Sequence, residues 1–495
     1  MTKAAIPNAP LTSLTWATFA RVVVYDGLDW VRPRADLTSV KVGALASASL
    51  VGLLERMQQA NVDQLWVYPR AFSADDQPPE PTPLALAECA RAGWQVSVAR
   101  PSYASPQGGG WISATRPGVY GIREIYWPAR DANLPFTTGH PEGTHGLALS
   151  LARFSAAIGA HWFRSGGATG QRLMREAMTH HTVYSLTPQT APPPALAPGR
   201  HMDGALVWLR DLTAAEASRR WLVSLDRNAA YLAAAGMTNL AAGPYTHREG
   251  AAALTAAEGA KAGIFFIVDY APPLGALALG LPDPLLSNAF ARKRSGWVSL
   301  PTLQLLDELG AGYRILDAYV TSEAHRALEP WYQRLKAARD AVLDVNAGAL
   351  SLVKRTYVAG LGWLAANETD GWDRSQDVFF RPDWYAAIKA LARANLYRKA
   401  HAAAALGFMP IAASTDAWYY VVNDPAELAT IRDKRSKPLY PLDASMAGWK
   451  LSLYDLEADG ELRALLCDTR YRTSARLQLL LRALNQRDAQ HGRAA

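Results

Sequence analysis

Two aspartates carry the most specific chemical signal in this 495-residue chain, because each lies where an apolar strand is expected to end. Asp226 follows the apolar run 221–225, and Asp416 lies between the apolar runs 408–414 and 418–423. A carboxylate at a strand end has its backbone held by the sheet while its oxygens face solvent, which suits a hard cation such as Mg²⁺. A single such aspartate is usually a cap or a turn former. If the two strands are neighbours, however, the pair can hold two Mg²⁺ ions.

A lysine lies between the two acids in the chain, in a stretch whose spacing predicts a helix. This residue, Lys354, would contact the charge of a triphosphate if the helix lay over the metal ions. Gly360 and Gly362 would let a base pair or a backbone approach the same helix closely, because glycine has no Cβ. Taken alone, Lys354 is better explained as a solvated lysine on the surface of a helix.

The order of these stretches resembles the motif order of the family B DNA polymerases, over residues 221–476. Residues 226–231 (DRNAAY) resemble motif A, an acid followed by asparagine at plus two and tyrosine at plus five. Residues 354–362 (KRTYVAGLG) are similar to motif B, although Val358 and Leu361 replace the usual asparagine and tyrosine.

The third motif is altered at one acid. Residues 412–421 (AASTDAWYYV) resemble motif C, whose usual form has two acids flanking a threonine; Ser414 replaces the first acid, and Thr415 and Asp416 remain. Residues 447–452 (AGWKLS) are similar to the region after motif C in protein-primed polymerases. The chain also looks like the divergent polymerase-like proteins associated with the telomeres of linear replicons.

The resemblance implies a role for each matching residue. Asp226 and Asp416 would hold the catalytic Mg²⁺ ions. Nucleotide-binding roles would fall on Arg227, Asn228, Tyr231, Lys354 and Gly362. Within this set, Tyr231 would stack under the incoming sugar and exclude a 2′-hydroxyl. The implied activity is that of a DNA-directed DNA polymerase with Mg²⁺ as cofactor, and the implied partners are a DNA primer-template or DNA terminus, dNTPs and a terminal protein.

The expected fold is α/β (α+β) in two domains. Alternating strands and helices over residues 1–186 predict an α/β domain, which the resemblance makes an RNase H-like domain of the exonuclease type. Its expected acid pair is missing, since Asp26 and Asp29 are three residues apart and Asp131 lies in a loop, so we expect no proofreading. Residues 187–200, rich in proline, predict a linker. Residues 201–495 would form a polymerase-like palm, fingers and small thumb.

Several expectations concern single elements. The pattern predicts a helix over 146–159, a strand over 161–165, one long helical region over 328–364 and a second helix over 382–407. The glycines of GGATGQ (166–171) lack the lysine of a phosphate-binding loop and predict a tight turn before a helix.

Composition restricts the protein class. Lys and Arg number 51 against 44 Asp and Glu, for a formal net charge of +7, and basic clusters from Arg292 onward favour a nucleic-acid groove. No apolar run reaches the roughly 18 residues of a membrane span, and the N-terminus lacks the apolar core of a signal peptide. The two cysteines form neither a disulfide framework nor a zinc cluster. We expect a cytoplasmic protein without membrane contact.

Two other functions compete with the polymerase. A catalytically decayed polymerase fold that binds DNA ends as a telomere-associated scaffold is favoured by Ser414 and by the altered motif B. An unrelated α/β enzyme is the other alternative, although His180, His181 and His201 lack partners at metal-ligand spacing.

Overall fold

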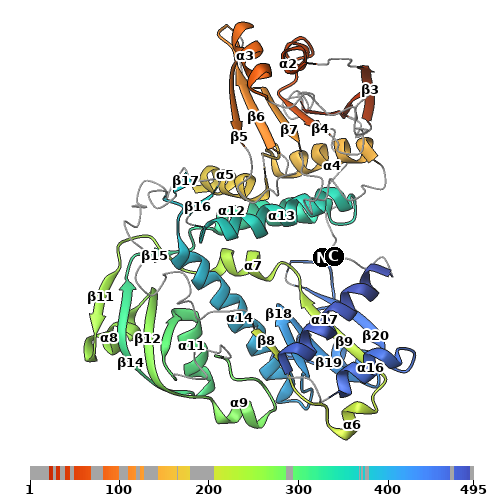
Figure 1. Cartoon of the computed structure of the whole chain (residues 1–495). Coiled ribbons are helices and arrows are strands. Elements are labelled where there is room, and N and C mark those ends of the chain that lie inside the picture. Colours follow the sequence, from red (N-terminus) through yellow and green to blue (C-terminus); the bar gives the residue numbers. More distant parts are fainter. Residues whose placement is uncertain are drawn as a thin grey trace. The chain divides into compact units, whose positions relative to one another are not determined.

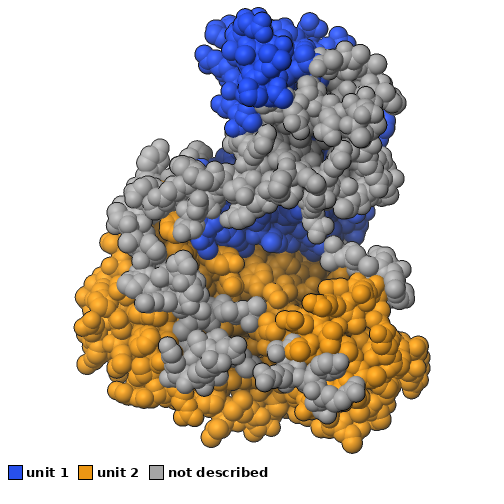
Figure 2. All heavy atoms as spheres, in the orientation of Figure 1, with its two compact units in different colours: residues 1–176, 333–377 blue, residues 177–332, 378–495 orange. Residues whose placement is uncertain are grey.

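Two units, each built from two stretches of chain, make up the structure (Figure 2): residues 1–176 with 333–377 form unit 1, and residues 177–332 with 378–495 form unit 2. The structure, a computed structural model, describes residues 22–25, 29–33, 39–44, 49–67, 82–99, 110–118, 123–127, 143–163, 165–178, 206–285, 294–366, 368–369, 372–373, 378–446, 448–468 and 473–490. The predicted linker 187–200 lies outside these residues, as do Asp26, Asp131 and the three histidines discussed above. The predicted domain division therefore stays a prediction.

Unit 1 contains a seven-stranded mixed sheet of order β3-β2-β1-β4-β7-β6-β5. Its strands are β1 (Val22–Tyr25), β2 (Asp29–Pro33), β3 (Ser39–Ala44), β4 (Gln64–Val67), β5 (Gln95–Ala99), β6 (Gly110–Thr115) and β7 (Arg123–Trp127). The central strands β1, β4 and β7 are parallel, and the outer pairs are antiparallel. Its helices are α2 (Leu50–Gln59), α3 (Pro83–Arg91), α4 (Gly143–Ile158), α5 (Gly166–Met178) and α13 (Ala347–Trp363). A small hairpin, β16 (Glu368–Thr369) and β17 (Trp372–Asp373), completes the described part of the unit. The mixed α/β class expected from the sequence is present.

The glycines of GGATG belong to a helix, so the predicted turn is wrong. They form the first turns of α5, where a Cβ on Gly166 or Gly170 would overlap the backbone of α13 at Arg355 or Thr356. Gly170 also meets Gly360 of α13. Glycine is required here because the two helices approach closely, and not because a loop must bend.

Two other predicted elements of this part are also corrected. Residues 161–163 are not a strand; they form an irregular segment in which Trp162 is buried. The region 328–364 is two helices, α12 (Glu329–Val342) and α13, with a break over 343–346. The break follows from Asn346, whose side chain accepts a hydrogen bond from the Ala349 N–H at 2.7 Å and so caps α13.

Unit 2 is built on a five-stranded antiparallel sheet of order β20-β9-β19-β18-β8 (Figure 1). Its strands are β8 (Leu206–Leu209), β9 (Trp221–Arg227), β18 (Ala412–Thr415), β19 (Ala417–Val422) and β20 (Trp449–Asp455). A second sheet has the order β11-β14-β12-β13, and a two-stranded ribbon pairs β10 with β15. Those strands are β10 (Leu240–Ala241), β11 (Thr246–Glu249), β12 (Ala262–Ala271), β13 (Gly296–Ser299), β14 (Gly312–Thr321) and β15 (Ala324–His325).

The helices of unit 2 cover these sheets. They are α6 (Ala214–Ala217), α7 (Ala230–Met237), α8 (Ala251–Gly259), α9 (Leu274–Ala278), α11 (Leu300–Leu309), α14 (Pro382–Ala404), α15 (Ala426–Thr430), α16 (Gly460–Cys467) and α17 (Thr473–Gln490). The predicted helix at 382–407 is confirmed as α14. None of the described helices combines the length and the hydropathy that a membrane crossing needs.

Side chains alternate across the five-stranded sheet and define two faces. One face, here the Arg227 face, buries Val223 and Leu225 of β9 against α14. The other, here the Asp226 face, buries Leu222 of β9 with Tyr419 of β19 against α16 and α17. Two cores therefore sandwich β9, and this holds the strand that carries Asp226.

A buried carboxylate near the end of β8 predicts a pH-dependent contribution to stability. Burial alone would raise the pKa of Glu216, but hydrogen bonds from Arg210 and Thr213 outweigh burial and lower this pKa to about 2. Arg210 donates through two nitrogens, at 2.5 and 2.8 Å, and Glu216 closes a capping box on α6 with Thr213. A depressed pKa stabilises the fold above the unfolded-state pKa of 4.5, and this contribution is lost as pH falls towards 2.

We therefore expect Glu216→Gln to lower the free energy of unfolding by about 1–3 kcal/mol at pH 7 and by less at pH 3. Urea denaturation at both pH values measures the difference. Glu457→Gln, at an exposed glutamate, is the control and should change stability by less than about 0.5 kcal/mol. An equal loss for Glu216→Gln at the two pH values would contradict the assignment.

Candidate active site

Asp226 is the penultimate residue of β9, immediately before the chain turns into α7. The strand is longer than predicted and includes both Asp226 and Arg227, because β19 and β20 pair with it along its length. Ala229 adopts a left-handed backbone conformation, with φ of 48°, at the start of α7. The expected strand–turn–helix around Asp226 is therefore present.

Asp416 lies at the tip of the predicted hairpin, between β18 and β19. Ser414 pairs with Ala417, which leaves Thr415 and Asp416 as a two-residue loop. Thr415 has φ of +57°, a conformation that costs a β-branched residue roughly 1–2 kcal/mol and that glycine usually occupies at this position. Strain of this kind persists where the surrounding structure imposes it, and functional sites are where it concentrates.

Cross-strand register brings the two acids to one end of the sheet. Asp226 pairs with Ala417, the residue directly after Asp416, and the Arg227 N–H donates to the Asp416 carbonyl at 3.2 Å. Paired Cα atoms are about 5 Å apart and consecutive ones 3.8 Å, so the Cα atoms of the two aspartates lie within about 9 Å of each other. The acids, 190 residues apart in the chain, are therefore neighbours in unit 2.

A row of side chains crosses the Asp226 face at this end of the sheet. Successive strand pairs place Val207, Ser414, Ala417, Asp226 and Lys450 next to one another. Val207 is 49% exposed, whereas Leu209, two residues further along the same strand, is buried. The cover given by α16 and α17 is thus incomplete at the β8 end of this row, whereas Ala417 in the middle of the row is still buried in that core.

Tyr419 interacts electrostatically with both acids. Burial, together with the nearby charges of Asp226, Asp416 and Asp488, raises the pKa of Tyr419 to about 12. Both carboxylates therefore act on the same hydroxyl. Tyr419 lies two residues after Ala417 of the row, on the same face of β19. Burial also raises the pKa of Asp416 itself. No ion pair to Asp416 occurs among the described residues, so its charge is compensated there by hydrogen bonding alone.

Tyr231 stands beside Asp416, on the second residue of α7. Burial and the charge of Asp416 raise the pKa of Tyr231 to about 12, with a smaller contribution from Tyr385 and an opposing one from Arg393. Tyr385 and Arg393 belong to α14, which packs along α7. The structure thus brings together Asp226, Asp416 and Tyr231 of the predicted residues, and adds groups of α14 to them.

Arg227 and Asn228 face away from the row. Arg227 lies on the opposite face of β9, where burial lowers its pKa and its Nε has no hydrogen-bond partner among the described residues. Asn228 bonds the loop before β20, through its N–H to the Gly448 carbonyl and its Nδ2 to the Asp443 carbonyl at 2.9 Å. A Cβ on Gly448 would overlap Asp443, so glycine permits this close approach. The visible role of Asn228 is to hold the turn after Asp226.

Lys354 and Gly362 belong to α13 of unit 1. Lys354 is half-buried there, and the space around Gly362 is open, so a Cβ would meet nothing within 4 Å. Their predicted nucleotide-binding roles stay predictions.

Four groups near the acids were not predicted from the sequence. They are Tyr385 and Arg393 of α14, Tyr419 of β19 and Lys450 of β20. Arg393 is 8% exposed and donates to Thr302 of α11 at 2.9 Å. The sequence predicts the helix at 382–407, but a helical repeat does not say which of its cations turns towards a strand far away in the chain.

The donor set limits which ions fit. Within the described ranges, no group of three or more His, Cys, Asp or Glu side chains is placed to hold a metal ion. Asp226 and Asp416 are two hard oxygen donors, which excludes a structural zinc site of the usual four-ligand type. Mg²⁺ commonly binds through one or two carboxylates, with water and substrate phosphates filling its other positions. The pair fits Mg²⁺ by its chemistry.

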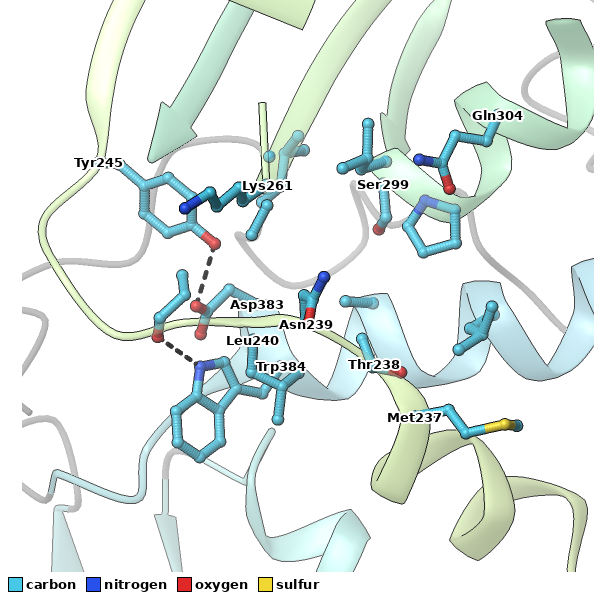
Figure 3. Close-up of a pocket in the computed structure, with 18 residues that line it drawn as sticks. Met237, Thr238, Asn239, Leu240, Tyr245, Lys261, Ser299, Gln304, Asp383 and Trp384 are labelled. Atoms are coloured by element: carbon cyan, nitrogen blue, oxygen red, sulfur yellow. Dashed lines mark hydrogen bonds between the residues drawn. The ribbon is translucent and has the colours of Figure 1, made fainter. Parts of the chain in front are cut away.

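A separate pocket of about 140 Å³ lies beside the first half of α14 (Figure 3). It is lined by residues of α7, β10, β12, α11 and α14, and none of the predicted site residues is among them. Figure 3 shows the Tyr245 hydroxyl directed at Asp383, to which it donates at 3.1 Å. The Trp384 Nε1 donates to the Ala241 carbonyl at 2.8 Å. These bonds fix the start of α14 against β10.

The comparisons with known proteins come from structure alone, since the sequence matches no family model and no curated protein. The chain is similar to phi29 DNA polymerase in its orthorhombic crystal form, with TM-score 0.46 and 14% identity over 81% of this chain and 78% of that chain. For the complex of that polymerase with primer-template DNA (the post-translocation binary complex), the TM-score is 0.47 and the identity 14%, over 83% and 80% of the chains. The complex with single-stranded DNA gives 0.47 and 12%, over 89% and 93%. Likeness at these values assigns neither an activity nor a ligand to this chain.

Proposed function

We propose that the protein is a DNA-directed DNA polymerase that works by two-metal nucleotidyl transfer, with Asp226 and Asp416 as its metal-binding acids. The single observation that carries this proposal is the register of β19 on β9, which makes the two aspartates neighbours at one end of one sheet. Carboxylates in that position match the hard-oxygen requirement of Mg²⁺. The resemblance of residues 226–231 and 412–421 to motifs A and C supports the same assignment.

The residues around the acids have distinct parts in this proposal. When bound, Mg²⁺ would activate a primer 3′-hydroxyl and neutralise the departing pyrophosphate. Asp226 and Asp416 hold their oxygens at fixed positions because β9 and the strained hairpin fix their backbones. Lys450, opposite Asp226 on β20, adds positive charge at the row where phosphate oxygens would lie.

The substrates of the proposed reaction are inferred from the resemblance. The partners are a DNA primer-template or DNA terminus and dNTPs, and the resemblance gives Lys354 and Gly362 a role in nucleotide binding. A terminal protein as primer, and action at the ends of linear DNA in the cytoplasm, complete the proposal. These finer features rest on the resemblance to protein-primed polymerases.

A second function is favoured by one specific observation. Ser414 occupies the row where a further acid would stand, about 10 Å from Asp226 and two strands away. With two acids instead of three, the fold could serve as a DNA-end-binding scaffold without synthesis. Such a scaffold binds DNA in a salt-dependent way and incorporates nothing.

Primer extension separates the two functions. The full-length protein is incubated with a labelled primer-template, Mg²⁺ and one dNTP at a time, over four templates that differ in the next base. We expect the primer to grow only with the dNTP complementary to the template, and not in EDTA. DNA binding without any extension would reject the polymerase and support the scaffold.

Tyr231 provides a test of sugar selection. Its hydroxyl interacts with Asp416 and with Tyr385 of α14, and burial with these groups raises its pKa to about 12. We expect Tyr231→Ala to raise rNTP incorporation relative to dNTP incorporation by about tenfold or more, because the space left by the tyrosine ring can accept a 2′-hydroxyl. Competition between dATP and ATP in primer extension measures the ratio, with Tyr385→Ala as the matched control on α14. An unchanged ratio would remove Tyr231 from the sugar site.

A further inference from the structure

An exposed turn in unit 2 carries four cations in seven residues. This turn, residues 432–438, is here called the basic turn; its basic residues are Arg432, Lys434, Arg435 and Lys437, all exposed. Its only acid is Asp433. None of the four cations has an ion-pair partner within 4 Å in the part of the chain that the structure describes. Four cations with a single acid among them leave the turn with a net charge of +3, and this exposed excess of positive charge favours an anionic partner.

The backbone holds these cations outward. The Asp433 N–H donates to the Lys437 carbonyl at 2.8 Å, and Asp433 Oδ1 accepts the N–H groups of Arg435 and Lys437 at 2.8 and 3.0 Å. The base of the turn is closed by the Leu439 N–H bonded to the Ile431 carbonyl, with both side chains in the core. The acid is thus used internally as a turn former, and the turn is ordered before any partner binds.

The basic turn adjoins the candidate site through α14. Asp433 and Lys399 of α14 attract each other, and the Tyr440 hydroxyl donates to the Lys399 carbonyl at 3.3 Å. Lys399 in turn lies close enough to Arg227 for the two positive charges to interact. Cations therefore continue from the basic turn through Lys399 to Arg227, which follows Asp226 in β9 and lies on the opposite face of the sheet.

A cluster of lysine and arginine residues that contains no aromatic side chains is suited to binding phosphate groups and not to binding bases. Flexible cations contact successive phosphates of a strand, and such contacts position a nucleic acid without reading its sequence. We propose that the basic turn, together with Lys399, binds the phosphate backbone of the DNA on which the Asp226–Asp416 site acts. The choice of DNA as the polyanion rests on the proposed function; the site itself is a separate surface.

The salt dependence of DNA binding tests this proposal without catalysis. Fluorescence anisotropy with a labelled primer-template duplex, in EDTA and without nucleotides, gives log K against log salt for the wild type and for Lys434→Ala/Arg435→Ala/Lys437→Ala. Each lost phosphate contact lowers the slope by about 0.9 for duplex DNA. We expect the triple variant to lower the slope by about 2–3 and to weaken binding about tenfold or more at low salt, in the same way on different sequences.

A second triple variant is the matched control. Arg248→Ala/Lys261→Ala/Arg326→Ala removes three exposed cations of the same unit; Lys261 lies at the pocket by the start of α14, about 24 Å along that helix from Lys399. We expect its salt slope to stay within about 0.5 of the wild type. Circular dichroism of both variants should match the wild type, because all six residues are exposed.

Several outcomes would overturn the proposal. An unchanged slope for the basic-turn variant, or an equal fall in the control, would remove the turn from DNA binding. A loss of binding to phosphatidylserine vesicles with unchanged DNA binding would assign the turn to a membrane surface. Failure of primer extension alone is a different result: it rejects the polymerase activity, and a reduced salt slope would still establish the basic turn as the DNA-binding surface.

Discussion

Replacing either candidate metal-binding acid, in Asp226→Asn or Asp416→Asn, should lower the rate of nucleotide incorporation by about 10³-fold or more while leaving the fold intact. Each change removes a charged oxygen from a pair in which both members are needed, and metal-ion stabilisation of transition-state charge is worth several kcal/mol, at about 1.4 kcal/mol for each tenfold. Asparagine keeps the size and the backbone preference of aspartate. Single-turnover primer extension with saturating dNTP measures the rate.

Two controls make this result interpretable. Asp344→Asn removes an exposed aspartate of the segment between α12 and α13 and should leave the rate within about twofold. The double variant Asp226→Asn/Asp416→Asn should be little slower than either single variant, because residues that act as one unit are not additive. A rate in Asp416→Asn equal to that of the wild type would show that the hairpin acid takes no part.

Breaking the buried ion pair at the start of α14 should cost about 3–5 kcal/mol of stability. The side chains of Arg381 and Asp383 are 1% and 0% exposed, with Arg381 donating at 3.0 Å from Nε and 2.6 Å from Nη2. Burial alone would lower the pKa of Arg381, but the charge and hydrogen bonds of Asp383 raise it. Asp383→Ala leaves a buried guanidinium with the Ala241 carbonyl and the Trp384 ring as its neighbours.

The measurement is the free energy of unfolding in urea. The double variant Arg381→Met/Asp383→Leu should lose less than Asp383→Ala, because no uncompensated charge is then buried. Glu308→Ala, which breaks an exposed pair with Arg398, should cost no more than about 1 kcal/mol. If Asp383→Ala also cost less than 1 kcal/mol, the pair would not be what holds α14 against β10.

Local sequence patterns predicted the elements that carry the two acids. The apolar run before Asp226 and the paired apolar runs around Asp416 are typical of strands, and Pro382 stands in the first turn of the predicted helix α14, where its missing N–H costs nothing. The order of the motifs predicts that Asp226 and Asp416 share one site. The register that makes Ala417 the partner of Asp226 is a tertiary property, which no local pattern contains.

The mistaken elements have physical causes of the same kind. The helix break over 343–346 depends on one side-chain cap, Asn346, inside an otherwise helical pattern. The GGATG glycines predict a turn because glycine is the commonest turn residue, whereas in the structure they allow the close packing of α5 on α13. Arg393 and Lys450 could not be predicted as neighbours of the acids. Helix packing places Arg393 near them and strand pairing places Lys450 there, and neither is visible in the local sequence.

The central claim, that Asp226 and Asp416 hold divalent ions jointly, is tested most directly by metal-directed backbone cleavage. Fe²⁺ with ascorbate and peroxide cuts a chain near the bound ion, so the cut positions report its ligands without any need for activity. The account predicts cleavage near both residue 226 and residue 416, suppressed by excess Mg²⁺ and absent in Asp226→Asn/Asp416→Asn. Cleavage at only one of these positions, or cleavage that persists in the double variant, would contradict it.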